Sequence, residues 1–163
     1  MRIAVISDTH MPRGTRVLPE DCVERLRRAD LVLHAGDVVA RPFLEELRAL
    51  GPPVEAVYGN MDDEALRTEL PKERVVAVAG ARIGMVHIPG PLAGRETRLL
   101  ERFPGCNAIV YGHTHVPQLE RHDGVFILNP GSPTERRRSP ARSMIELEIG
   151  GEGLIPTLVQ FGP

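Results

Sequence analysis

Residues 2–10 have the sequence Arg2-Ile3-Ala4-Val5-Ile6-Ser7-Asp8-Thr9-His10, an apolar run that ends in a polar tripeptide. A short apolar run of this kind predicts a buried strand, which we place at 2–7. Similar runs at 31–35 and 54–58 are separated by stretches with helical periodicity at 19–28 and 41–50. Strands that alternate with helices usually pair in parallel. The first half of the chain therefore predicts an α/β fold.

The second half of the chain predicts more strand than helix. One β-hairpin is expected where 74–79 and 82–87 flank Gly80-Ala81, and another where 117–121 and 125–128 flank His122-Asp123-Gly124. Helices are expected at 62–70 and 92–103, and further strands at 107–111, 143–149 and 154–161. No repeat, low-complexity segment or linker interrupts this pattern. We therefore expect one domain over residues 1–163.

The composition is that of an ordinary globular protein and excludes some classes of function. Of the 163 residues, 42% are hydrophobic and 26% are charged, and the formal net charge is −2. There is no Trp, and the two Tyr and four Phe leave little material for stacking on bases. Without a broad basic field or stacking platforms, extended nucleic-acid binding is not expected.

The apolar segments and the cysteines indicate the compartment. No apolar run reaches the roughly 20 residues of a membrane span, and Ser7-Asp8 follows the first strand too soon for a signal-peptide core. Cys22 and Cys106 lie far apart and form no Cys-x-x-Cys pair. This spacing favours reduced core residues over a zinc clip or a disulfide. We expect a cytoplasmic protein without a membrane partner.

Polar side chains follow the predicted strands at the points where the strands end. Ligand sites in open α/β sheets form at the carboxyl ends of strands, so five segments are expected to bring these side chains to one edge. Gly36-Asp37 and Gly59-Asn60 are, by themselves, common turn dipeptides. In Gly112-His113-Thr114-His115, two histidines one residue apart behind an apolar run favour metal binding over core packing. The candidate ligands are Asp8, His10, Asp37, Asn60, His87, His113 and His115.

The ordered blocks Asp-x-His, Gly-Asp, Gly-Asn, His and Gly-His-x-His resemble those of the calcineurin-like metallophosphoesterase superfamily. The resemblance runs from Ile3 to about Ser132 and is strongest to the short, single-domain phosphodiesterase branch. The block Asn129-Pro130-Gly131-Ser132 is also similar to one of that branch. The resemblance implies a metallophosphoesterase-type α/β sandwich, with two mixed β-sheets flanked by helices, and a centre of two divalent metal ions.

The resemblance also implies which residues hold each metal. The first-metal positions match Asp8, His10, Asp37 and His115, and the second-metal positions match Asp37, Asn60, His87 and His113, so that Asp37 bridges. Mixed carboxylate, amide and imidazole ligands suit divalent metals such as Mn, Fe, Zn and Ni. We expect Mn, with Ni, Zn, Fe or Mg as alternatives. Two metals about 3.5–4 Å apart lower the pKa of a shared water, so a metal-bridging hydroxide is the expected nucleophile. Catalytic contributions are expected from Asp37, Asn60, His113 and Asp62.

Two positions depart from the family pattern. Many members have a histidine after the Gly-Asn pair that is a candidate proton donor to the leaving group, whereas this chain has Met61 followed by Asp62. The identity of the general acid is therefore open, with Asp62 either a substitute acid or a partner of a ligand. Members more often have Gly directly after the ligand histidine, where this chain has Ile88. A reshaped loop and altered substrate access are the expected consequences.

Some polar residues fall outside the ligand set. The run Arg136-Arg137-Arg138 is either a solvated loop or a set of contacts to the substrate phosphate. His122 is expected to lie in a turn without a metal. His34 lies inside an apolar run and is expected to be structural, or to donate a hydrogen bond to Asp8 or Asp37.

Together these patterns predict a divalent-metal-dependent phosphoesterase, and foremost a phosphodiesterase acting on a small phosphodiester. Phosphomonoesterase or nuclease activity on the same dimetal centre is the nearest alternative, because these activities share the ligands and differ in the pocket walls. A non-catalytic scaffold is another, since retromer-type trafficking subunits of this fold look like protein-binding scaffolds with an eroded metal site. This chain keeps every ligand position. The expected partner is the small phosphoester substrate, and a homo-oligomer is left open.

Overall fold

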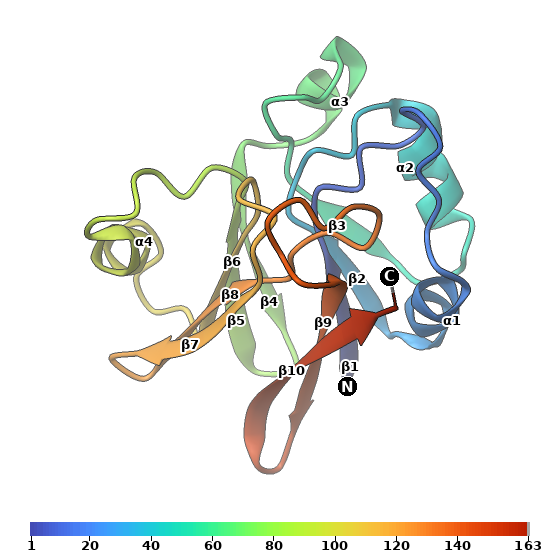
Figure 1. Cartoon of the computed structure of the whole chain (residues 1–163). Helices are drawn as coiled ribbons and strands as arrows, with labels where there is room; N and C mark the ends of the chain where they lie inside the picture. Colours follow the sequence, from blue (N-terminus) through green and yellow to red (C-terminus); the bar gives the residue numbers. More distant parts are fainter. Residues whose placement is uncertain (163) are drawn as a thin grey trace.

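Two five-stranded sheets pack against each other in the computed structural model, which describes residues 1–162 (Figure 1). The first sheet has the strand order β10-β9-β1-β2-β3 and the second has the order β4-β5-β6-β8-β7. The strands of the first sheet are β1 (Arg2–Ile6), β2 (Leu31–His34), β3 (Val54–Ala56), β9 (Arg142–Gly150) and β10 (Gly153–Phe161). Those of the second are β4 (Glu73–Val78), β5 (Ala81–Val86), β6 (Ala108–Tyr111), β7 (Gln118–His122) and β8 (Val125–Asn129).

Each sheet combines three parallel strands with antiparallel ones, so both are mixed as predicted. β1, β2 and β3 run parallel, with Val5 opposite Leu33, and β5, β6 and β8 run parallel in the other sheet. β9 and β10 pair antiparallel on one side of the first sheet, and β4 and β7 are the antiparallel edges of the second. Because the central strands run parallel, their carboxyl ends lie at one edge of each sheet. The candidate ligands follow the strands at that edge.

Apolar side chains fill three layers. The central core lies between the sheets, where Val5 and Leu33 of the first sheet pack with Met85 and Val110 of the second. α1 (Glu20–Arg28), α2 (Arg41–Arg48) and α3 (Glu64–Glu69) bury Leu26, Leu44 and Leu66 in a cluster on the outer face of the first sheet. α4 (Arg95–Arg102), at the left of Figure 1, buries Leu99 against the second sheet. The predicted α/β sandwich is therefore confirmed.

The hairpin turns differ from the prediction by one residue. The β4–β5 turn is Ala79-Gly80, with φ of 49° and 79°, so Ala81 belongs to β5 rather than to the turn. The β7–β8 turn is Asp123-Gly124, with φ of 50° and 79°, and His122 ends β7. Two-residue hairpin loops with positive φ at both positions match the strand twist, and His122 pairs with Val125 in the ladder rather than lying in the turn.

Three of the predicted helices begin or end short of their expected bounds. The helix predicted at 92–103 begins only at Arg95, because Gly94 has a left-handed φ of 69°. The helix predicted at 62–70 begins at Glu64, because the Asp63 carboxylate caps it by accepting from the Leu66 N–H at 2.9 Å. α2 ends at Arg48 rather than at residue 50. No helix within residues 1–162 is long and apolar enough to cross a membrane.

Candidate metal centre

The predicted metal ligands all lie at the carboxyl ends of the central strands. Asp8 and His10 follow β1, Asp37 follows β2 and Asn60 lies beyond β3. The second sheet contributes His87 after β5, and His113 and His115 after β6. Asn60 and His113 are exposed, and the other five side chains are buried. The cluster therefore has a buried end and an end that faces solvent.

The buried end is formed by Asp8, His10 and His115. Asp8 Oδ1 lies 3.8 Å from His10 Nε2 and 3.2 Å from His115 Nε2. The other oxygen, Asp8 Oδ2, accepts from the Ser7 hydroxyl at 2.7 Å and from the His113 N–H at 3.0 Å. The protein thus fixes one oxygen of Asp8 and leaves the other facing three imidazole nitrogens, the third being His87 Nε2 at 3.8 Å.

Asp37 and His87 lie in the middle of the cluster. Asp37 Oδ2 lies 3.5 Å from His10 Nε2 and 3.2 Å from His87 Nε2, while Asp37 Oδ1 accepts from the Met61 N–H at 2.8 Å. His87 Nδ1 lies 2.7 Å from the carbonyl oxygen of Ala35. Because a carbonyl only accepts, Nδ1 donates, and Nε2 is the ring nitrogen that faces the cluster. Burial works to lower the pKa of His87, but its interaction with Asp37 raises it. A metal ion would take the place of a proton at Nε2.

Asn60 and His113 form the exposed end. Asn60 Oδ1 lies 3.1 Å from His87 Nε2 and 3.0 Å from His113 Nδ1, so the amide oxygen points into the cluster. The His113 ring meets the His87 ring edge-on, with centroids 5.3 Å apart. Solvent reaches the cluster from this end because both side chains are exposed.

The buried atoms of the cluster fit a cation. Asp8 Oδ1 and His10 Nε2 are buried and have no hydrogen-bond partner within residues 1–162. Burial works to raise the pKa of Asp8, but interactions with His10 and His115 hold it well below its usual range. Burial also works to raise the pKa of Asp37, but its interaction with His87 lowers this pKa below the usual value. Asp8, Asp37 and His87 offer ligand atoms within 4.8 Å of one another. Ionised carboxylates buried this close are costly without positive charge between them.

The ligand loops have an unusual backbone. Among the seven predicted ligands, Asn60 and His87 alone have no positive φ in the part of the chain described. Left-handed conformation costs a non-glycine residue roughly 1–2 kcal/mol. Such strain persists where the surroundings fix it, and it gathers at binding and catalytic sites. The strained ligands are Asp8 (φ 56°), His10 (47°), Asp37 (55°), His113 (71°) and His115 (59°).

The glycines before Asn60 and His113 are needed because the backbone passes very close to the cluster. A Cβ on Gly59 would lie 2.2 Å from Asp37 Oδ1, and one on Gly112 would lie 2.1 Å from Ser7 Oγ. Both glycines look like ordinary turn signals in the sequence. The structure gives them a different reason, since any side chain there would collide with a ligand or with the hydroxyl that fixes one.

His34 joins two ligand loops. The Gly36 N–H donates to His34 Nδ1 at 3.2 Å, so Nδ1 is an acceptor and Nε2 donates to the Thr9 hydroxyl at 3.0 Å. Burial lowers the pKa of His34 to about 3, which keeps the ring neutral. His34 accepts from Gly36 and donates to Thr9, and it has no hydrogen bond to Asp8 or Asp37. Of its two expected roles, the structure favours the structural one. His34 therefore ties the loop after β1 to the loop after β2.

Asp62 is committed to the backbone. Its two carboxylate oxygens accept from the N–H groups of Val39 and Gly59, each at 2.6 Å. Burial raises the pKa of Asp62, and these two hydrogen bonds oppose the rise. Val39 has a φ of 94°, a strained value for a β-branched residue, and Asp62 holds it in place. Of the two roles predicted for Asp62, this geometry favours the partner of a ligand loop over the general acid.

Glu135 belongs to the site although no sequence motif marks it. Glu135 Oε1 lies 3.2 Å from His115 Nδ1, on the side of the ring opposite Asp8, and Oε2 accepts from Arg16 Nε at 3.1 Å. The separation from His115 is an ion-pair distance without the alignment of a hydrogen bond, because His115 Nδ1 has no hydrogen-bond partner within residues 1–162. A carboxylate on this side of a ring whose Nε2 faces the cluster is in the position of a partner to a metal ligand. Arg137 Nε donates to the same Glu135 at 2.8 Å. The only signal in the sequence is that Glu135 directly precedes the arginine run.

The predicted substrate-binding run, Arg136-Arg137-Arg138, lies on an exposed loop. Arg137 pairs with Glu135, and Arg136 Nη1 lies 3.5 Å from the carbonyl oxygen of Pro140. The structure thus brings Arg137 to the partner of a ligand rather than to the exposed end of the cluster. A direct role of the run in substrate binding stays a prediction.

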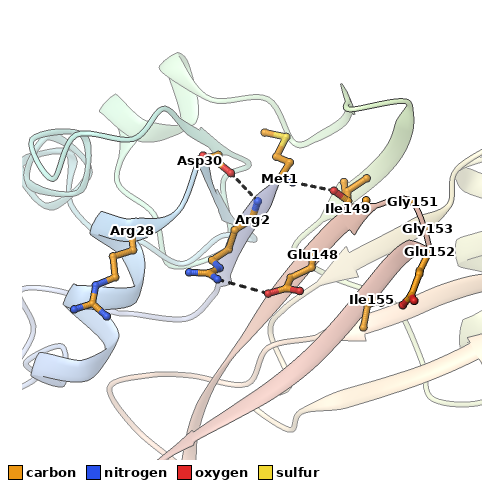
Figure 2. Close-up of a pocket in the computed structure, with 11 residues that line it drawn as sticks. Met1, Arg2, Arg28, Asp30, Glu148, Ile149, Gly151, Glu152, Gly153 and Ile155 are labelled. Carbon is orange, nitrogen blue, oxygen red and sulfur yellow. Dashed lines mark hydrogen bonds and ion pairs between the residues drawn. The ribbon is translucent and has the colours of Figure 1, made fainter.

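Two hollows of the surface differ in their relation to the cluster. Figure 2 shows a cavity of about 560 Å³ at the start of β1, lined by residues that include Met1, Arg2 and Glu148. It lies at the opposite end of β1 from Asp8, and Arg2 pairs with Glu148 at 3.7 Å. A smaller cavity of about 250 Å³ includes Asn60 and His87 in its lining and so adjoins the exposed end.

The comparisons with known proteins agree with this geometry. The sequence matches the calcineurin-like phosphoesterase superfamily domain over residues 1–152. It is 37% identical to a probable metallophosphoesterase of Methanothermobacter thermautotrophicus, an alignment that covers 99% of this chain and 94% of the relative. Vps29 of Entamoeba histolytica, in a structure with zinc, has a TM-score of 0.78 at 24% identity, covering 99% of this chain and 100% of that one. An archaeal phosphodiesterase has a TM-score of 0.76 at 21% identity, covering 98% and 100%.

The fold and the cluster therefore define a metallophosphoesterase. More specifically, this chain belongs to the calcineurin-like phosphoesterase superfamily. The two solved structures, at below 25% identity, show only that the fold is shared.

Proposed function

We propose that this chain is a dinuclear, divalent-metal-dependent phosphodiesterase that hydrolyses a small phosphodiester. The observation that carries the proposal is the buried end of the cluster, where Asp8 Oδ1 and His10 Nε2 have no partner within residues 1–162. Membership of a phosphoesterase family supports the hydrolysis of phosphoesters. The archaeal phosphodiesterase of the same fold supports a diester as substrate.

The ligand set divides in two in this proposal. Asp8, His10, Asp37 and His115 would hold one metal ion, and Asp37, Asn60, His87 and His113 the other, with Mn as the first choice. When bound, such ions would supply Lewis acidity and a water of lowered pKa for an in-line displacement. The chain's contribution is orientation. Hydrogen bonds with Ala35 and the Met61 N–H fix His87 and Asp37, and Glu135 lies 3.2 Å from His115 Nδ1.

At the exposed end the chain binds the substrate phosphate and offers little help to the leaving group. The exposed side chains of Asn60 and His113 carry donors that can bind a phosphate oxygen. Met61 is 38% exposed beside them and has no proton to donate. The Asp62 oxygens are engaged by the backbone. We infer that the leaving oxygen takes its proton from water.

Other functions of the same fold remain as named alternatives. A phosphomonoesterase or a nuclease would use the same ligands with different pocket walls. A non-catalytic scaffold is favoured by one observation, the close match of the fold to Vps29, a structure with bound zinc. Metal binding alone does not separate that scaffold from an enzyme, so an assay of turnover is required.

The test is a metal analysis joined to a substrate panel. The purified protein is assayed for bound metals, stripped with a chelator, and reloaded with Mn, Ni, Zn or Mg before phosphodiesters and phosphomonoesters are offered. We expect diester hydrolysis that disappears on chelation and returns with metal. His10→Ala should abolish it, whereas the matched His122→Ala, at the end of β7, should retain it. Stoichiometric metal without any turnover would favour the scaffold, and faster hydrolysis of monoesters would overturn the diester assignment.

We further propose that residues 1–163 form one domain and that the protein works in the cytoplasm. The compartment is supported by Cys22 and Cys106, which are free and buried, as expected for thiols in a reducing environment. Limited proteolysis that yields two stable fragments would contradict the single domain.

A further inference from the structure

The cavity beside the exposed end has a cationic wall. Besides Asn60 and His87, its lining includes Tyr58, Arg67 and Lys72, which is the only lysine of the chain. Within the described residues 1–162, no carboxylate lines this cavity. The low dielectric of a partly enclosed site strengthens the attraction of such charges for an anion. None of these three side chains belongs to the ligand motifs.

Arg67 is held in place by the loop that carries Asn60. Its Nη2 donates to the carbonyl oxygen of Asn60 at 2.6 Å, and its Nε donates to that of Asp62 at 2.9 Å. The guanidinium carbon lies 5.9 Å from the centre of the Tyr58 ring. These contacts fix the guanidinium without neutralising it. A guanidinium oriented in advance loses less entropy when it binds an anion.

The charges of Arg67 and Lys72 are not compensated. Neither side chain pairs with a carboxylate in the part of the chain described. Neighbouring arginines show the opposite behaviour, since Arg48 pairs with Glu69 at 2.7 Å and Arg74 with Glu55 at 2.6 Å. Unpaired positive charge therefore gathers at the cavity that adjoins the metal ligands.

Lys72 and Ile88 also line a second cavity, of about 590 Å³, together with residues of α4. That cavity has mixed charge, because Glu101 lines it beside Arg98 and Arg102, and Arg102 pairs with Glu73. Ile88, which stands where the family more often has glycine after the ligand histidine, is 43% exposed and belongs to the lining of both cavities. Of these two cavities, the one beside Asn60 thus carries the uncompensated positive charge.

We propose that this cavity binds an anionic substituent of the substrate, so that the preferred substrate is a phosphoester carrying a second phosphate or carboxylate group. The scissile phosphate would lie at Asn60 and His113, and the second anion at Arg67 and Lys72. The inference rests on the proposed function for the position of the first phosphate. It deepens that function by naming the charge of the group esterified to it.

The test measures equilibrium binding of phosphonates, which are not hydrolysed. Isothermal titration calorimetry on the Mn-reloaded and on the stripped protein compares an alkyl monophosphonate with alkyl bisphosphonates of two to five carbons. The bisphosphonates should bind about tenfold more tightly or better, with an optimum of chain length, because the second anion gains charge-assisted hydrogen bonds. Lys72→Gln should remove most of this advantage.

Matched variants separate the cavity from a general effect of charge. Arg27→Gln, on the exposed surface of α1, loses the same charge and should retain the advantage of the bisphosphonates. Arg67→Lys keeps the charge and loses the fork geometry, so it should reduce the advantage without abolishing it. Equal affinity for both phosphonates in the unaltered protein, or an equal loss in Lys72→Gln and Arg27→Gln, would overturn the proposal.

A parallel assay distinguishes this proposal from the proposed function. Hydrolysis of a diester without additional charge, such as bis(4-nitrophenyl) phosphate, reports on the metal centre alone. If the protein hydrolyses that diester but binds bisphosphonates no more tightly than monophosphonates, the anion-binding role of the cavity is wrong and the phosphodiesterase proposal is unaffected. If the protein binds bisphosphonates more tightly but hydrolyses no phosphoester, the anion-binding role of the cavity stands and the proposed phosphodiesterase activity is wrong.

Discussion

The two ends of the ligand cluster are built for different tasks. At the buried end, two hydrogen-bond donors hold Asp8, Glu135 lies at an ion-pair distance from His115, and no side chain is exposed. At the exposed end, Asn60 and His113 contact each other and His87, and both face solvent. Ligands that are packed and oriented by outer partners hold a metal firmly. The buried end is therefore suited to retention of a metal, and the exposed end to exchange and substrate binding.

The largest expected effect comes from Asp37, which lies between the two ends. Asp37→Ala should abolish phosphodiesterase activity and reduce the content of both metals, because Asp37 Oδ2 faces His10 as well as His87. Asn60→Ala should lower the content of one metal and leave the other near its original level. Metal analysis by plasma mass spectrometry, with kcat measured alongside, checks both. Near-normal turnover with two metals in Asp37→Ala would refute the bridging role.

The next effect concerns the leaving group at the exposed end. General acid assistance is typically worth a factor of 10²–10⁴, and Met61 supplies none. Hydrolysis of aryl phosphodiesters should therefore slow steeply as the leaving phenol becomes more basic. Met61→His should accelerate the poorest leaving groups most, provided that metal content is unchanged. The measurement is kcat/KM across a series of phenols.

Asp62→Asn is the companion experiment for the leaving group. Because the carboxylate holds Gly59 and Val39, the variant should lower metal content at the exposed end without changing the slope of rate against phenol pKa. A slope that becomes steep only in Asp62→Asn would identify Asp62 as the general acid. Rates that are nearly independent of phenol pKa while chemistry is rate-limiting would contradict the missing acid altogether.

Glu135 tests the buried end. Loss of a partner that orients a metal ligand typically costs 10–100-fold in metal affinity or activity. Glu135→Ala should show a loss of about this size, measured as a shift in the chelator concentration that strips the more tightly held metal. Glu24→Ala, an exposed position on α1 whose carboxylate pairs with Arg28, is the control and should show no shift. Equal behaviour of the two variants would remove Glu135 from the site.

The smallest effect is expected at the arginine run. If Arg136, Arg137 and Arg138 contact the substrate phosphate, their replacement by Gln should raise KM in a salt-sensitive manner and leave metal content unchanged. If Arg137 acts through Glu135, Arg137→Gln alone should instead ease removal of the more tightly held metal. Unchanged kinetics and unchanged metal content would make the run a solvated loop.

Features that depend on local sequence could be predicted, and features that depend on contacts between distant segments could not. The strands, their parallel pairing and the position of the seven ligands follow from local apolar runs, because each run ends where its polar residues begin. The turn at Ala79-Gly80 was predicted one residue too late. Strand register decides whether the residue before or after the glycine joins it in the turn with positive φ. Glu135 and the cavity at Arg67 and Lys72 depend on contacts between distant segments, which no single pattern records. The role of Asp62 likewise required its two backbone partners.

The tight passage of the backbone at Gly59 and Gly112 also bears on how such a protein can change over generations. Neither position leaves room for even one methyl group. An alanine at either place would push on Asp37 or Ser7 while the apolar layers of both sheets stayed as they are. A single Gly→Ala change at either position is therefore expected to disturb the predicted metal ligands while the apolar core stays intact.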